Sequence, residues 1–181
     1  WTFKYYRHGD VRIRNGGKRY WAESGRELTT EAPTVTPRTY TAQEPHERIR
    51  AHRSDVQSAL AGESTLLDVR TAAEYRGEQR TPEDGVPTAR AVGRIPNAVH
   101  LEWTEVVDDD WHFERRSRLE RMFAAAGVEE DDDVIVYCNV GERAALVWFV
   151  LSELLGYRNV ANYDGSWAEW GMHSDLKVAT K

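Results

Sequence analysis

The feature that most constrains the fold is the alternation of short apolar runs with helix-forming segments between residues 46 and 171. Four runs have the length and composition of buried strands, namely 65–69, 98–103, 134–137 and 159–164. Continuous apolar strands separated by helices are typical of a mostly parallel sheet that helices cover on both faces. The sequence therefore predicts an α/β fold.

Helical patterns fill the intervals between these runs. The expected helices are an amphipathic segment at 47–61, a helical turn or two at 71–77, longer helices at 115–126 and 143–155, and a short helix from Ser166. Gly127 and Gly156 follow the two long helices, as glycine commonly does at a helix end.

The N-terminal part of the chain resembles the C-terminal part. Residues 10–21 align with residues 159–170 without gaps, so that Gly16 falls on Gly165 and Trp21 on Trp170. We therefore expect residues 1–30 to be the remnant of a preceding repeat of the same domain, in a fragment of a longer tandem protein. Residues 31–45 combine Pro, Thr and Glu without periodicity, which predicts an extended linker. Residues 46–181 then form the catalytic domain.

Composition excludes several classes of function. The formal net charge of −6 argues against nucleic acid or an anionic membrane as a partner, and no apolar run has the roughly 18 residues of a membrane span. The single cysteine excludes an internal disulfide and a cysteine-based zinc site, which fits a cytoplasmic location. No histidines pair at helical spacing, so we expect no metal.

That cysteine, Cys138, lies at a turn between a predicted strand, 134–137, and a predicted helix that Arg143 opens. Backbone amides of such a turn surround the sulfur, and the helix N-terminus favours thiolate over thiol. A structural cysteine would more often lie inside the strand than at its exit. Because ligands of open α/β sheets bind at the carboxyl ends of strands, the position favours a nucleophile.

Four motifs occur together along the chain: "LLDVRTAAEYRGE" (66–78), "GRIPNAVHLEW" (93–103), "VIVYCNVGER" (134–143) and "NVANYDGSWAEW" (159–170). In this order and spacing they resemble the rhodanese family of sulfurtransferases over residues ~45–171, and the N-terminal repeat resembles the tandem, two-domain type. The resemblance implies a three-layer sandwich in which the second domain carries the active cysteine. The sequence departs from the family pattern at Arg94, Asn97 and Asn139, and only Asn139 bears on the choice of substrate.

The resemblance also implies roles for single residues. Cys138 would accept a sulfane sulfur as a persulfide, and Asp68 and Arg70 would brace and charge the site. Arg70 would also bind the sulfur donor, together with Arg143. The turn that cradles the sulfur would comprise Asn139, Val140, Gly141, Glu142 and Arg143. Arg143 would be the cation of this turn, either held by its neighbour Glu142 or in a solvated surface pair. No metal or organic cofactor is required.

The expected reaction is ping-pong transfer of sulfur from thiosulfate to cyanide or a thiol. One alternative is a 3-mercaptopyruvate sulfurtransferase that uses the same cysteine. A second is a phosphatase of similar architecture, although its loop has one more residue between cysteine and arginine than the four found here. A third is a non-catalytic rhodanese module that only binds partners. The expected partners are a small sulfur donor, an acceptor and the missing first domain.

Overall fold

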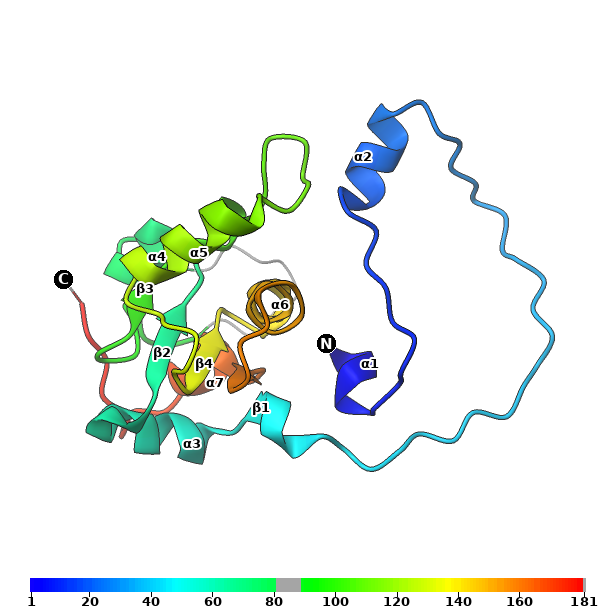
Figure 1. Ribbon diagram of the computed structural model, residues 1–181. Coiled ribbons are helices and arrows are strands. Elements are labelled where there is room, and N and C mark those ends of the chain that lie inside the picture. The colour runs from blue at the N-terminus through cyan, green and yellow to red at the C-terminus, as the bar shows by residue number, and fades with distance from the viewer. Residues whose placement is uncertain (81–88, 181) are drawn as a thin grey trace.

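The computed structural model describes residues 1–80 and 89–180, apart from the side chain of Glu63. Within these ranges five strands form one parallel sheet in the order β1-β5-β4-β2-β3 (Figure 1). The strands are β1 Arg50–Ala51, β2 Thr65–Asp68, β3 Val99–His100, β4 Val134–Tyr137 and β5 Val160–Tyr163. The predicted α/β class with its parallel sheet is confirmed.

Helices surround the sheet on both faces. They are α3 Arg53–Ser58, α4 Ala72–Arg76, α5 Arg116–Ala125, α6 Glu142–Phe149 and α7 Ser166–Trp170. Two π-type segments, Ala59–Glu63 and Val150–Leu155, continue α3 and α6, and two short 3₁₀ segments, η1 and η3, span Glu47–Ile49 and Trp103–Val106. The N-terminal segment adds α1 Thr2–Tyr5 and α2 Gly17–Glu23.

The core has two layers because neighbouring strand residues point to opposite faces. Leu67 and Val136 pack in one layer with Leu119 of α5 and Val147 of α6. In the other layer, Leu66, Ile135 and Tyr163 pack with Val56 of α3 and Trp167 of α7.

Three buried tryptophans lie in these layers. They are Trp148, Trp167 and Trp170, and their burial assigns them to core packing.

The segment expected as one helix at 47–61 is divided, so that prediction was wrong. The 3₁₀ turn η1 leads into β1, which pairs with β5 through Ala51 and Tyr163, and α3 starts only at Arg53. Asp55 closes a capping box by accepting from the backbone N–H of His52 at 2.7 Å. A two-residue strand is too short to show a periodicity of its own, so the sequence pattern could not reveal it.

The N-terminal segment runs beside the domain and contacts it at separate points (Figure 1). The indole of Trp1 donates to the Ile49 carbonyl at 3.0 Å, and the Asn15 side chain accepts from the backbone of Phe113 at 2.8 Å. Residues 10–14 form no strand, and residues 24–46 contain neither helix nor strand. The assignment of 1–30 to a preceding repeat stays a prediction.

No helix within residues 1–80 and 89–180 is both long and apolar enough to cross a membrane.

Candidate functional site

Cys138 directly follows β4 and is 1% exposed. Its sulfur accepts a hydrogen bond from the backbone N–H of Gly141, with an N···S distance of 3.2 Å. Helix α6 begins at Glu142, so its N-terminus, with its partial positive charge, adjoins the turn that holds the sulfur. The turn therefore brings one backbone amide and a helix N-terminus to the sulfur, while the role of Cys138 as a nucleophile stays a prediction.

The turn depends on Gly141, whose φ of +85° lies in the left-handed region. A Cβ at this position would lie 2.8 Å from the Cα of Asp164, so a side chain would meet backbone. The Gly141 carbonyl accepts from the side-chain amide of Asn162 at 3.2 Å. Both restraints come from β5 and the residue after it, so the neighbouring strand fixes the shape of the turn.

Residues at the start of α7 hold the other side of the turn. The backbone N–H of Cys138 donates to Ser166 Oγ at 3.1 Å, and the Ser166 hydroxyl donates to the Tyr163 carbonyl at 2.6 Å. The carbonyl of Cys138 accepts from the N–H of Trp167 at 3.0 Å. Ser166 is completely buried and has a φ of +50°, which is uncommon for a residue other than glycine. Sequence reasoning missed Ser166 as a site residue.

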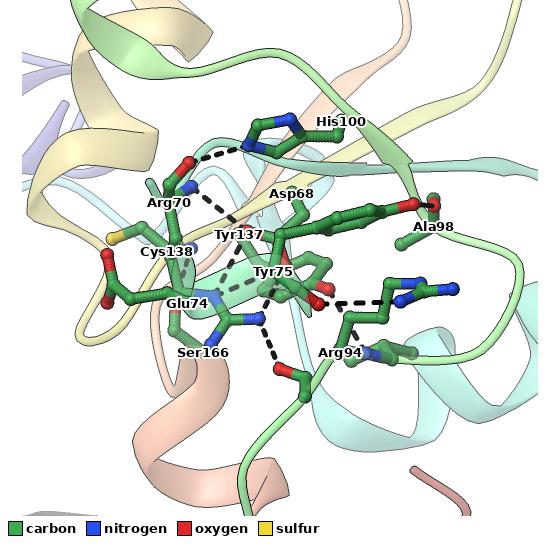
Figure 2. A network of polar contacts seen from close by, with 12 residues as sticks. Asp68, Arg70, Glu74, Tyr75, Arg94, Ala98, His100, Tyr137, Cys138 and Ser166 are labelled. Atoms are coloured by element: carbon green, nitrogen blue, oxygen red, sulfur yellow. Dashed lines mark hydrogen bonds and ion pairs between the residues drawn. The ribbon is translucent and has the colours of Figure 1, made fainter. Parts of the chain in front are cut away.

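Arg70 and Asp68 form a buried ion pair beside Cys138 (Figure 2). Arg70 Nη2 donates to Asp68 Oδ2 at 2.6 Å and to the Gly93 carbonyl at 2.7 Å, and the guanidinium lies 4.6 Å from the Trp167 ring centroid. Burial alone would lower the pKa of Arg70, but the adjacent Asp68 carboxylate outweighs it and raises that pKa. Arg70 is 1% exposed, so the guanidinium is enclosed rather than presented to solvent.

Arg143 forms an ion pair with Glu74, which is neither of the two arrangements that the sequence left open. Its Nη1 and Nη2 donate to the two Glu74 oxygens at 2.8 and 3.2 Å. Glu74 also accepts from the backbone N–H and the hydroxyl of Thr71, both at 3.0 Å, in the capping box of α4. The Glu74 side chain is 1% exposed. This carboxylate therefore joins the start of α4 to the end of the cysteine turn.

Tyr137, the last residue of β4, extends the network towards residues 93–95. Its hydroxyl accepts from the backbone N–H of Ile95 at 3.1 Å, and its side chain is fully buried. Burial, and then the negative charge of Asp68, raise the pKa of Tyr137 well above its ordinary value. Tyr137 stays protonated and holds the segment that accepts from Arg70.

The structure places the predicted site residues around one turn but in different surroundings. Cys138, Asn139 and Gly141 are buried, Val140 and Arg143 are partly buried, and Glu142 is exposed. Asp68 and Arg70 lie in the adjoining ion pair. The motif Thr71–Glu74 is a capping-box signature, which could have marked Glu74 but not its bond to Arg143. Across the described ranges, no group of three or more His, Cys, Asp or Glu side chains could hold a metal ion.

Comparison with curated proteins gives relatives over nearly the whole chain. A Haloferax volcanii protein provisionally named thiosulfate sulfurtransferase is 44% identical over 171 residues, covering 94% of this chain and 60% of that protein. The sulfur carrier protein TtuD of Thermus thermophilus is 43% identical, covering 99% of this chain and 65% of that protein. The chain thus spans about three-fifths of the length of these relatives.

Solved structures give the same fold. A variant of EanB in complex with ergothioneine superposes with a TM-score of 0.86 at 26% identity, covering 98% of this chain and 43% of that chain. A second EanB structure, with ergothioneine covalently linked to a cysteine persulfide, has a TM-score of 0.85.

A comparison with protein families completes the assignment. The family described as Rhodanese-like domain matches residues 52–173, a range that contains β2 to β5, the cysteine turn and α7. The chain belongs to the rhodanese family.

Proposed function

We propose that this chain is a sulfurtransferase that carries sulfane sulfur as a persulfide on Cys138. The observation that carries the proposal is the position of the only cysteine, at the exit of β4, with its sulfur accepting from the Gly141 amide beside the start of α6. A thiolate stabilised by amides and a helix N-terminus is a nucleophile that needs no neighbouring base.

The relatives support the same chemistry. One is provisionally named a thiosulfate sulfurtransferase and another is a sulfur carrier protein, while EanB has been solved with a cysteine persulfide linked to ergothioneine. These names concern proteins longer than this chain, so they support the proposal without extending it to a particular acceptor.

The reaction has two steps. The Cys138 thiolate attacks the outer sulfur of thiosulfate, the S–S bond of the donor breaks, and sulfite leaves with the electron pair. A Cys138 persulfide anion remains. Cyanide or a thiolate then attacks the outer sulfur of the persulfide and takes it as thiocyanate or a new persulfide, which restores the Cys138 thiolate. Amide dipoles of residues 139–143 stabilise the anionic sulfur in each step.

The ion pairs suggest how the site divides its tasks. Arg70 is enclosed by Asp68 and Trp167, so we assign it to bracing the turn rather than to contact with the donor. Arg143 is partly exposed, with 15% of its side chain accessible, but the Glu74 carboxylate beside it offsets its positive charge. The donor is therefore held chiefly by backbone amides.

This pairing favours 3-mercaptopyruvate as a second candidate donor. Thiosulfate brings two negative charges to the sulfur, whereas 3-mercaptopyruvate carries one, on a carboxylate away from its sulfur. Because buried carboxylates neutralise both Arg70 and Arg143, the turn offers little surplus charge to a dianion. Initial rates with the two donors, with cyanide as common acceptor, distinguish the candidates.

The proposal extends to the domain arrangement of the whole protein and to its cellular location. Residues 1–30 would end a preceding repeat, residues 31–45 would link it to the catalytic domain, and the preceding domain would be a partner in the whole protein. A reaction that depends on a free thiolate suits a reducing compartment, which supports a cytoplasmic location.

Mass spectrometry tests the central step. After incubation with thiosulfate and removal of excess donor, the intact protein should gain the mass of one sulfur atom, and cyanide should remove it. Cys138→Ser should lose the added mass and at least roughly a thousandfold of the transfer rate. A folded Cys138→Ser protein that still forms thiocyanate at the original rate contradicts the proposal. Wild-type protein that gains no sulfur from either donor supports a non-catalytic module instead.

A further inference from the structure

A cavity of about 810 Å³ lies at the amino-terminal ends of β4 and β5, on the edge of the sheet opposite the cysteine turn. Val134 and Val160, the first residues of these strands, line it, while Cys138 follows the last residue of β4. At about 3.3 Å per residue, the length of β4 separates the cavity from the sulfur by roughly 13 Å. The cavity is therefore distinct from the proposed catalytic site.

Lys4 of α1 and residues 7–9 after it line this cavity, and the helix is docked at defined points. Tyr5 donates its hydroxyl proton to Glu47 at 2.8 Å, and its carbonyl accepts from the N–H of His46 at 2.7 Å. Lys4 forms an ion pair with Glu153 at 3.1 Å. Contacts from η1 and from the continuation of α6 thus hold α1 in place. The cavity is built from four parts of the chain, namely residues 4–9, 46–49, 133–135 and 148–161.

Basic side chains dominate the lining. Lys4 is balanced by Glu153, but within residues 1–80 and 89–180 none of Arg7, Arg48 and Arg158 forms an ion pair with a carboxylate. Apart from Glu153, the only acidic residue in this lining is Asp133. The cavity therefore keeps a surplus of positive charge in a chain whose formal net charge is −6.

The backbone at Arg7 directs one of these cations. Arg7 has a φ of +56°, in the left-handed region that is rarely occupied by residues other than glycine. Its Nε donates to the carbonyl of Glu44 at 3.1 Å, which holds the side chain against the linker. This conformation closes helix α1, since the N–H groups of Arg7 and His8 donate to the carbonyls of Lys4 and Phe3 at 2.9 and 2.8 Å.

Part of the cavity lining is apolar. It includes Trp148, Ile49 and Ala161 together with the two strand-opening valines. Guanidinium groups bind phosphate in a bidentate manner, and apolar lining residues can contact the organic part of a phosphorylated ligand. The volume falls within the range of roughly 300–1,000 Å³ that is usual for small-molecule sites. We propose that this cavity binds an organic polyphosphate of nucleotide size.

Isothermal titration calorimetry with ATP, in the absence of divalent cations, tests the proposal. Inorganic tripolyphosphate lacks the organic body and adenosine lacks the charge, so each should bind at least tenfold more weakly than ATP. Raising the salt concentration should weaken ATP binding, because phosphate contacts are screened.

Paired variants locate the binding. Arg48→Gln/Arg158→Gln should weaken ATP binding at least tenfold. The control Arg38→Gln/Arg121→Gln removes the same charge from exposed positions outside the cavity and should change it less than twofold. Arg158→Gln alone serves as a milder variant if the double one does not fold. Cys138→Ser should bind ATP normally, so failure of the proposed catalytic function leaves this test intact.

Three outcomes overturn the proposal: no binding at about 1 mM ATP, equal weakening in the cavity and control variants, or tripolyphosphate binding as tightly as ATP.

Discussion

At the carboxyl edge of the sheet, the guanidinium groups of Arg70 and Arg143 are each held by a buried carboxylate, whereas Arg48 and Arg158 at the amino edge have no such partner among the described residues. A buried charge pair is costly to break, so it fixes geometry more than it offers charge to a ligand. An exposed, unpaired guanidinium fixes little but remains available to an anion. The ion pairs at the carboxyl edge therefore fix the geometry around the cysteine, whereas the arginines at the amino edge keep positive charge that can bind an anion.

The largest effect, on stability, is expected from Asp68→Asn at the carboxyl edge of the sheet. The substitution leaves Arg70, which is 1% exposed, without its carboxylate, and should lower the free energy of unfolding by about 3–5 kcal/mol. Urea denaturation measures this difference. The control Asp10→Asn breaks the exposed pair with Arg12 and should have little effect. Equal, small effects in both variants would mean that burial of the pair does not contribute to stability.

A smaller effect is expected from Gly141→Ala. The new Cβ would require an unfavourable φ and would contact the backbone of Asp164, so we expect a loss of about 2–3 kcal/mol and at least tenfold in transfer rate. Gly156→Ala is the matched control, since its φ is also positive but no atom lies within 4 Å of the added carbon. It should lose about 1 kcal/mol and keep its rate. Denaturation and thiocyanate formation, measured together, would show whether the turn tolerates a side chain.

The smallest of the three effects concerns donor choice. Glu74→Gln keeps the shape of the side chain but removes the negative charge beside Arg143. The ratio of kcat/KM for thiosulfate to that for 3-mercaptopyruvate should rise several-fold, because the dianion gains more from the released positive charge. Glu142→Gln removes an equal charge from the exposed neighbour and should change the ratio less. If the ratio is unchanged in Glu74→Gln, charge pairing does not govern donor choice.

The sequence allowed prediction of those parts of the site that are continuous along the chain. Strand 134–137 has the bounds that its apolar run indicated, and Cys138 lies at its exit as expected. The pair of Glu74 and Arg143 could not be predicted, since 69 positions separate the two residues and only folding brings them together.

Burial was equally hidden in the sequence. The local pattern around Arg70 does not show that Trp167 and Gly93 enclose its guanidinium. Glu74 and Ser166, which act through long-range contacts, are the site residues that sequence reasoning missed.

The two outermost strands of the described sheet have a consequence for self-association. β1 and β3 each contain only two residues, while the three strands between them contain four. An edge strand recruits another molecule by offering a row of unpaired backbone groups, and a two-residue strand offers few. Each side of the described sheet thus offers few backbone groups with which a strand of a neighbouring copy could pair.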